Sequence, residues 1–459
     1  MFTRFLVLYT ACLLMAALCH AQAHAPEQQL SNKEISILID SLGNALSRYY
    51  IYPAKATEMM SSIKKKYKSG AYNSIKNRAD LGRQLNNDLQ QAHKDGHLEV
   101  MYHPQMANDL ETYVPDTASN RRAYEHDLHD ALENNFGFKK VELLPGNIGY
   151  LRWDVFCGLT DEALPTTNGA LRFVSNCSAL IIDMRNNGGG SPDMVVQLQS
   201  YFFKEKTPMN YTITRSNDTL KRCADPAKTD FKLSMPVYIL TSHSTFSAAE
   251  DFIYGLRNAG RITVVGDTTG GGAHPTRPFS IGHGFVAFIP TQYSYNMATH
   301  TDWEGIGIWP DAPVPAAQAL TKAQALIYAQ LLSKATGERE KNSLQWLLAS
   351  TENKALVAKQ IQDDNIKIPK EDLLKYCGEY NSADPDAPKN AIYIVLTGTH
   401  LARHVAVGAA DVRLIPIAAG KFAYDDESGR TIEFVTNTKD NTSGMILSNQ
   451  DGVFTLNKK

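Results

Sequence analysis

The stretch PVYILTSHSTFSAAEDFIYGLRNAG (236–260) decides how the central part of the chain folds. Its first residues are apolar and rich in β-branched and aromatic side chains, which is typical of a buried strand. After a short loop, apolar residues at helical spacing predict a helix over 247–258. Ser247 stands where that helix begins, so it is either an ordinary helix cap or a nucleophile that has the Ala248 N–H beside it.

Three similar apolar runs lie on either side of this stretch. NIGYLRW (147–153), ALIIDMR (179–185) and RITVVGD (261–267) are candidate strands, and a further helix is expected at 191–203. Strands that alternate with helices indicate α/β organisation, with a sheet covered on both faces. A functional site is then expected in the loops that leave the strands.

One of these loops is DMRNNGGGSPD (183–193), in which a strand runs into three glycines and then a helix. Such a loop exposes backbone N–H groups to an anion. No Lys-Ser or Lys-Thr follows the glycines, and the GxGxxG spacing is absent, so the loop does not match a nucleotide-binding motif. The same geometry suits an oxyanion hole.

Composition excludes some classes of function. The chain has 459 residues, enough for about three domains, with 43% hydrophobic residues, 20% charged residues and a net charge of -2. There is no basic excess to hold nucleic acid, so neither DNA nor RNA is expected as a partner.

Residues 1–25 have the pattern of a secretory signal peptide: an early arginine, an apolar run and a small-residue end that fits cleavage after Ala23 or Ala25. The alternative is a membrane anchor, but the apolar run is shorter than a spanning helix needs. Lipidation at Cys19 is a lesser alternative, since Leu18 precedes it. We therefore expect an exported chain with no stable membrane insertion after signal removal.

Four cysteines remain beyond the signal segment, and they are widely spaced with no CxxC pair. Zinc binding by cysteine is therefore not expected. In an oxidising compartment these residues allow three disulfide pairings, and free thiols remain equally open. The four are Cys157, Cys177, Cys223 and Cys377.

Residues 26–104 are predicted to form a helical domain. The capping box SNKE (31–34) opens a helix, and two more helices follow, of which the third is expected to stop at Gly96. His97 then sits at a helix-to-strand junction. His93 and His97 are four apart, but no HExxH pattern is present, so no metal site is predicted here.

Two further segments follow a core predicted over 105–320. Residues 321–369 are expected to be a helical connector, and 370–459 a small β domain of short strands such as AIYIVLTG and TIEFVTN. YCGEYNS and the strands after it resemble the small β-barrel modules appended to secreted serine hydrolases.

Five motifs in fixed order resemble the tail-specific (C-terminal processing) serine peptidase family. They are DGHL, DMRNNGGG, TFSAAEDF, GDTTGGG and WEGIGIWPD, all within 95–311. Over roughly 30–320 the chain is most similar to the branch that includes the modules of interphotoreceptor retinoid-binding protein. The resemblance implies a crotonase-like ββα spiral core with an N-terminal helical bundle, in keeping with the absence of a GxSxG elbow.

The resemblance also implies roles for single residues. Ser247 becomes the nucleophile, and Gly271 stands where many members carry the lysine base, so a Ser/Lys dyad is excluded. Tricorn-like members use histidine and glutamate, which here are His97 as base and Glu304 as the carboxylate that orients it. The oxyanion hole is assigned to the N–H groups of Ala248 and Gly189. Neither a metal nor a cofactor is implied.

Each of these residues also has a plain structural interpretation. Alone, His97 reads as a histidine at a helix end and Glu304 as a surface carboxylate, and only the complete set favours catalysis. Neighbouring residues of the same chemical types compete for the roles: Ser242, Ser244, His243 and His274.

The sequence therefore predicts a secreted or periplasmic serine peptidase that acts through an acyl-enzyme on a peptide or unfolded protein. Only about forty residues separate Pro104 from Gly146, too few for the PDZ domain with which relatives grip substrate tails. The alternative function is a non-catalytic carrier of hydrophobic ligands such as retinoids or lipids, for which the Ser247, His97 and Glu304 set would be unnecessary.

Overall fold

The described part of the chain falls into two units. The computed structural model describes residues 30–75, 77–113, 117–363, 366–382, 388, 390–404, 410–426, 428–437 and 441–459. The signal segment expected at 1–25 and its cleavage sites lie outside these ranges. Unit 1 comprises described residues up to His129 together with Pro208–Arg222 and Gly271–Gly307, and unit 2 comprises Asp130–Thr207, Cys223–Gly270 and Ile308–Lys459. Within the described ranges, no helix has the length and apolarity needed to span a bilayer.

Three helices begin unit 1 and confirm the predicted helical region. They are α2 (Asn32–Tyr49), α3 (Pro53–Lys68) and α4 (Arg78–Ala92). The predicted capping box is present at the start of α2, where the side chains of Ser31 and Glu34 each bind the other's backbone N–H. The third helix ends at Ala92, four residues before Gly96, so the predicted stop at that glycine was wrong.

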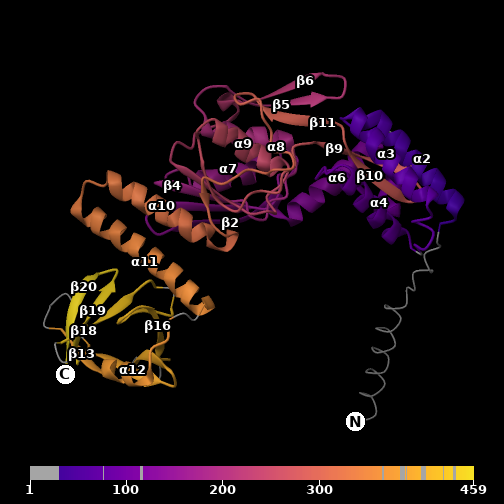
Figure 1. Cartoon of the computed structure of the whole chain (residues 1–459). Coiled ribbons are helices and arrows are strands. Elements are labelled where there is room, and N and C mark those ends of the chain that lie inside the picture. The colour runs from indigo at the N-terminus through magenta and orange to yellow at the C-terminus, as the bar shows by residue number, and fades with distance from the viewer. Residues whose placement is uncertain are drawn as a thin grey trace, which may run out of the picture. The chain divides into compact units, whose positions relative to one another are not determined.

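The helices pack on a three-stranded antiparallel sheet, visible beside them in Figure 1. Its order is β1-β10-β9, and its buried side chains join the helices in one apolar core. A second sheet of unit 1 has the order β11-β5-β6. The strands are β1 (Glu99–Tyr102), β5 (Thr207–Thr214), β6 (Thr219–Ala224), β9 (Thr276–Gly282), β10 (Phe285–Pro290) and β11 (Gln292–Asn296).

Three further elements lie between this region and the central sheet along the chain: α5 (Pro104–Thr112), α6 (Thr117–Glu133) and the 3-10 turn η1 (Asn135–Gly137). Together with β2 they occupy the stretch in which the sequence left too little room for a PDZ domain.

A six-stranded sheet forms the centre of unit 2, with the order β12-β8-β7-β4-β3-β2. β3, β4, β7, β8 and β12 run parallel, and β2 pairs antiparallel at one edge. Every residue of β4 and β7 is buried, as the continuous apolar runs predicted. The strands are β2 (Phe138–Leu144), β3 (Ile148–Trp153), β4 (Ala179–Asp183), β7 (Val237–Thr241), β8 (Thr263–Gly266) and β12 (Ala312–Pro313).

The helices of this sheet confirm the α/β prediction. They are α7 (Ala163–Phe173), α8 (Pro192–Gln199), α9 (Ala248–Asn258) and α10 (Ala319–Lys334). The helix expected over 191–203 ends earlier, at Gln199, and continues as the 3-10 turn η2 (Ser200–Phe202). Short 3-10 turns also occur at η3 (Pro226–Lys228) and η4 (Ala316–Gln318). The finer expectation of a crotonase-like spiral stays a prediction.

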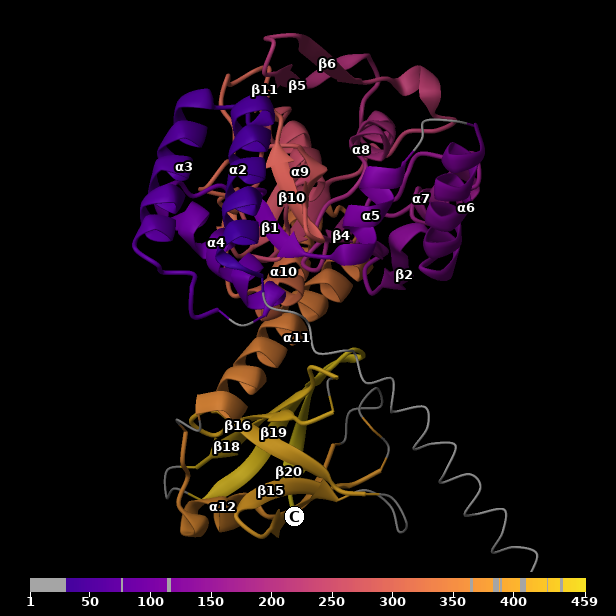
Figure 2. The same cartoon turned by 90° about the vertical axis from the view of Figure 1, so that its right-hand side faces the viewer.

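The C-terminal part confirms the expected small β domain. After α11 (Glu338–Asp363) and α12 (Lys370–Tyr376), eight antiparallel strands close into a barrel, drawn in yellow in Figure 2. Apolar side chains such as Tyr380 and Leu456 fill its interior. The strands are β13 (Gly378–Asn381), β14 (Ile392–Thr397), β15 (His400–His404), β16 (Val412–Ala418), β17 (Lys421–Tyr424), β18 (Thr431–Thr436), β19 (Thr442–Asn449) and β20 (Gly452–Lys458).

The four cysteines beyond the expected signal segment are free thiols in the structure. None of the three possible disulfide pairings left open by the sequence is formed. They are Cys157, Cys177, Cys223 and Cys377.

Candidate active site

Ser247 lies at the turn between β7 and α9, with φ 56° and ψ -121°. An ordinary N-cap serine has an extended backbone, as do Ser31 (φ -66°) and Ser191 (φ -72°) in this same chain. A positive φ is costly for a serine and is typical of residues that a functional turn holds in a strained conformation. The conformation of Ser247 therefore differs from that of a simple cap.

Glu250 holds this turn from inside the protein, where its side chain is fully buried. Its Oε2 accepts the backbone N–H of Ser247 at 2.9 Å, and its Oε1 accepts the Thr269 hydroxyl at 2.5 Å. The Thr269 Oγ1 in turn accepts the N–H of Ile308 at 2.7 Å. Two loops of unit 2 are thus tied to the start of α9 through one carboxylate.

The glycine loop after β4 approaches the same turn at van der Waals distance. Gly189 has φ 110°, and a Cβ built on it would lie 2.9 Å from both the Ala248 nitrogen and the Ser247 Cβ. Only glycine permits this approach. The backbone N–H groups of Gly189 and Ala248 therefore belong to adjoining turns, as an oxyanion hole requires.

Asn187 links the two turns, and its side chain already accepts a hydrogen bond from the Gly189 N–H, one of the two expected oxyanion donors. Its backbone carbonyl accepts the Phe246 N–H at 3.0 Å, and its side-chain Oδ1 accepts the Gly189 N–H at 2.9 Å. Its Nδ2 donates to the Trp153 carbonyl at 3.1 Å. Use of the Gly189 N–H by an oxyanion would require this hydrogen bond to be shared or exchanged.

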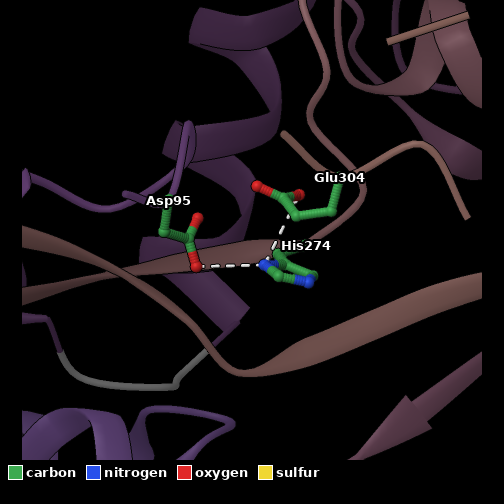
Figure 3. Close-up of side chains that lie close together, drawn as sticks. All are labelled: Asp95, His274 and Glu304. Atoms are coloured by element: carbon green, nitrogen blue, oxygen red, sulfur yellow. Dashed lines mark hydrogen bonds and ion pairs between the residues drawn. The ribbon is translucent and has the colours of Figure 1, made fainter. Parts of the chain in front are cut away.

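The histidine and glutamate of the predicted triad lie in unit 1, where Glu304 belongs to a cluster of ionisable groups with Asp95 and His274 (Figure 3). The Nδ1 of His274 is 3.0 Å from Asp95 Oδ2 and 3.4 Å from Glu304 Oε2. Glu304 Oε2 also accepts the Ala273 N–H at 2.6 Å. His274, which the sequence treated as a competitor of His97, thus contacts Glu304 directly.

His97 lies on the turn between α4 and β1, next to this cluster. Its backbone N–H donates to Asp95 Oδ1 at 3.1 Å, and the N–H of Gly96 donates to Glu304 Oε1 at 3.4 Å. Burial lowers the pKa of His97 to about 4, against the opposing effect of the Asp95 charge. The imidazole is therefore neutral at pH 7, as a general base must be.

Asp95 is a site residue that sequence reasoning missed. It is fully buried, and its Oδ2 accepts the Tyr50 hydroxyl at 2.8 Å. Burial acts to raise the pKa of Asp95, but its contacts with His274, Tyr50 and the His97 N–H lower it overall. The available signal was its place two residues before His97 within DGHL, since buried carboxylates rarely occur without a structural or chemical role.

The structure groups the predicted residues into two sets. Ser247, Ala248 and Gly189 adjoin one another in unit 2. In unit 1, Glu304 accepts a backbone N–H of the turn that carries His97. The competing residues near Ser247 are placed differently. Ser242 donates its hydroxyl to the Arg185 carbonyl at 2.5 Å, and His243 and Ser244 are exposed.

The cluster in unit 1 also has the composition of a metal ligand set, with two carboxylate oxygens and one imidazole nitrogen within 4.8 Å of one another. The oxygens that face His274 already accept protein donors, from Tyr50 and from the Ala273 backbone. We therefore describe Asp95, His274 and Glu304 as a hydrogen-bonded cluster.

A cavity of about 560 Å³ lies in the C-terminal part of the chain. Its lining includes apolar residues of α11, α12 and the barrel, such as Ile361, Leu373 and Phe422, with Lys367 and Arg413. None of the candidate site residues lines it.

Two family models match the chain. The model described as "Peptidase family S41" matches residues 147–314, and that described as "N-terminal domain of Peptidase_S41 in eukaryotic IRBP" matches residues 29–145. The first range contains Ser247, Gly189 and Glu304, and the second contains His97.

Curated relatives are similar over part of their length. The chain is 27% identical over 182 residues to carboxyl-terminal-processing peptidase 2, chloroplastic, of Arabidopsis thaliana, covering 38% of this chain and 34% of the relative. It is 26% identical over 191 residues to a carboxyl-terminal-processing protease of Picosynechococcus, covering 41% and 42%. The chain thus spans less than half the length of these relatives.

Among solved structures, a putative peptidase from Parabacteroides merdae is 20% identical to the chain, with a TM-score of 0.46, over 66% of this chain and 99% of that one.

Proposed function

Because the chain belongs to peptidase family S41, we propose that it is a serine peptidase that hydrolyses peptide bonds through an acyl-enzyme. In this proposal Ser247 is the nucleophile, His97 the general base and Glu304 the carboxylate that orients it. The observation that carries it is the backbone of Ser247, whose positive φ is joined to the close approach of Gly189. Ser247 also forms a capping box with Glu250, but neither feature is needed for one, since Ser31 forms a capping box with an extended backbone.

The proposed reaction follows the logic of a serine triad. The Ser247 hydroxyl attacks the scissile carbonyl carbon while His97 takes its proton, and the carbonyl oxygen becomes an oxyanion. The N–H of Ala248 binds that oxygen, and the N–H of Gly189 joins it by sharing or exchanging its hydrogen bond with Asn187. His97 then gives its proton to the leaving amine, and a water molecule, activated by the same imidazole, hydrolyses the acyl-enzyme.

The electrostatics of His97 support its role. The low pKa of His97 keeps the imidazole free to accept a proton at neutral pH, and the charge of Asp95 acts to stabilise the imidazolium once it forms. The proposed residues are divided between the units, since Ser247 belongs to unit 2 and His97 and Glu304 belong to unit 1.

A peptide or unfolded protein is the proposed substrate, by analogy with the relatives named carboxyl-terminal-processing peptidases. Export to the periplasm or the extracellular space is proposed from residues 1–25 alone, which lie outside the described ranges.

The decisive experiment is covalent labelling of the purified chain with a fluorophosphonate probe, with mass spectrometry to locate the adduct. We expect the adduct on Ser247, and its loss in Ser247→Ala and His97→Ala. Ser244→Ala removes an exposed hydroxyl three residues away and should label like the wild type.

Thermal unfolding of the same variants separates chemistry from folding. Ser247→Ala should unfold within a few degrees of the wild type, since it removes one oxygen at a turn that Glu250 holds through the backbone. If well-folded wild type takes no label, the peptidase proposal fails, and retinoid and lipid binding become the functions to measure.

A further inference from the structure

His274 is placed between two carboxylates that come from distant parts of the chain (Figure 3). Its Nδ1 faces Asp95 Oδ2 at 3.0 Å and Glu304 Oε2 at 3.4 Å, and its Nε2 is 3.3 Å from the Tyr52 hydroxyl. His274 is 4% exposed and Asp95 is fully buried. Ionisable groups from distant segments are rarely buried together without a structural or functional role.

We propose that His274 is a positioning residue of the peptidase site: held as an imidazolium, it bridges Asp95 and Glu304 and so fixes the turn that carries His97. This inference rests on the proposed function for its consequence in catalysis. The bridge itself is a property of the folded chain and is measurable without activity.

The charges of Asp95 and Glu304 support a protonated His274. Two carboxylates that face one nitrogen in a buried site repel each other unless a cation lies between them. Burial acts to lower the pKa of His274, but the hydrogen bond with Asp95 and the charges of Glu304 and Asp302 raise it overall. The pKa of Glu304 is raised by burial and by Asp95, and His274 opposes that rise. The protonated imidazole is therefore the group that lets both acids ionise.

The backbone contacts of the two carboxylates connect the bridge to the turn that carries His97. Asp95 Oδ1 accepts the N–H of His97, and Glu304 Oε1 accepts the N–H of Gly96. The two carboxylates thus bind consecutive amides of one turn from residues more than 200 positions apart in sequence. A cation that joins the carboxylates closes this ring of contacts and restrains the backbone of the turn that carries His97.

Titratable groups of several elements face or surround His274. Tyr52 contacts its ring edge to face, with centroids 5.4 Å apart, and Tyr50 donates to Asp95. The acids are Asp95, Glu304 and Asp302, the phenols are Tyr50 and Tyr52, and the other histidines are His93 and His97.

The first test is a titration of the histidine side chains by NMR in the full-length chain, with the His274 signal assigned through His274→Asn. We expect His274 to stay protonated above pH 6.5 and to lose its proton at lower pH in Asp95→Asn and in Glu304→Gln. Should His274→Asn fail to fold, the histidine signal that responds to both of the other substitutions identifies the residue.

The second test is the dependence of kcat on pH in His274→Asn, which keeps a donor near the Nδ1 position but cannot carry charge. We expect kcat to fall about 10- to 100-fold with KM within about twofold, as for other residues that orient a catalytic group. The acidic limb of the kcat profile should also move to higher pH, because both Glu304 and His97 then gain protons more readily.

His283→Asn is the matched control, since His283 is a histidine of unit 1 at the β9-β10 turn, and asparagine tolerates its φ of 54°. It should leave kcat and its pH profile unchanged. A fall in kcat of His274→Asn without movement of the acidic limb would mean a structural role only and overturn the proposal.

The two proposals fail separately. If Ser247 takes no label but His274 titrates high and responds to both carboxylates, the peptidase function fails and the bridge stands. An ordinary titration of His274 overturns the bridge whatever the activity. A divalent metal ion that copurifies with the wild type and is lost in His274→Asn would likewise overturn it, in favour of a metal centre.

Discussion

Single residues in this chain adopt conformations that only the surrounding turns can enforce. Ser247 has a positive φ although it is not glycine, and Gly189 packs its backbone against Ser247 and Ala248. Such conformations cost about 1–3 kcal/mol each and persist where neighbouring contacts over-determine them. Glu250, through the Ser247 N–H and the Thr269 hydroxyl, supplies those contacts.

Alanine substitutions at the adjacent Gly188 and Gly189 should show whether the backbone conformation of Gly189 matters, since both variants gain the same methyl group. Gly189→Ala should destabilise the chain by about 1–3 kcal/mol and abolish labelling of Ser247, because its Cβ would meet the Ala248 nitrogen at a φ of 110°. Gly188→Ala meets nothing within 4 Å and should be nearly silent. Denaturant unfolding and labelling rates measure both, and equal behaviour of the two variants would contradict the proposed close approach.

Glu250→Gln should reveal how much the serine turn depends on a carboxylate. The amide group matches the carboxylate in size, but it cannot accept hydrogen bonds at both positions, so one of its two donors loses its partner. We expect a loss of about 1–3 kcal/mol in the free energy of unfolding and slower labelling of Ser247. Glu205→Gln, at an exposed position, is the control, and an unaffected labelling rate in Glu250→Gln would argue against the dependence.

Among the elements, the loops that follow strands carry several of the proposed site residues, including Gly189 and Ser247. The loop after β8 includes Gly271, whose carbonyl accepts the Gly305 N–H at 3.0 Å. Gly271 has φ 85°, and a Cβ there would lie 2.9 Å from the Gly307 nitrogen. This is the position at which many members of the resembled family carry a lysine base, and here the backbone of a second loop fills the space.

Gly271→Lys should therefore not create a serine-lysine dyad. We expect it to destabilise the chain, because the new side chain demands both a left-handed backbone and room that the loop at Gly307 occupies. The measurement is fluorophosphonate labelling of His97→Ala with and without Gly271→Lys. Labelling that returns in the double variant would show that lysine can replace the proposed histidine base.

Across the whole molecule, the two units are built from interleaved segments, so the stability of unit 1 depends on residues far apart in sequence. His97 and His274 both lie in unit 1, and they change the pH dependence of its stability in opposite directions. The pKa of His274 is raised, so its contribution is present below about pH 6.5 and is lost as the pH rises through its folded pKa. The pKa of His97 is lowered, which gives the reverse dependence.

His97→Gln should accordingly flatten the acid side of the stability profile. Between pH 6.5 and about 4 the unfolded chain binds a proton at His97 that the folded chain excludes, so stability falls by up to about 3 kcal/mol as the pH is lowered. Thermal unfolding from pH 4 to pH 7 should show a smaller decline in the variant. His126→Gln, on the exposed face of α6, should decline like the wild type, and identical slopes in all three proteins would contradict the low pKa.

Much of the fold was predictable because it follows from local sequence patterns. The apolar runs of β3, β4, β7 and β8 and the capping box of α2 depend on residues close together in sequence, and the structure confirms them. The end of α4 was not predictable in this way, since Gly96 is a good stop signal. In the folded chain, the turn between Ala92 and His97 is instead held by Glu304, a residue more than 200 positions away.

The sequence by itself determined the α/β core, the helical N-terminal region, the C-terminal β domain and the motif that carries Ser247, because each follows from nearest neighbours and periodicity. Only the tertiary structure decided the backbone conformation of Ser247, the packing of Gly189 against it, and the cluster of Asp95, His274 and Glu304. The physical reason is that burial, charge pairing and left-handed turns are imposed by contacts between distant segments. No local pattern distinguishes His274 from an ordinary histidine, whereas two buried carboxylates at its Nδ1 do.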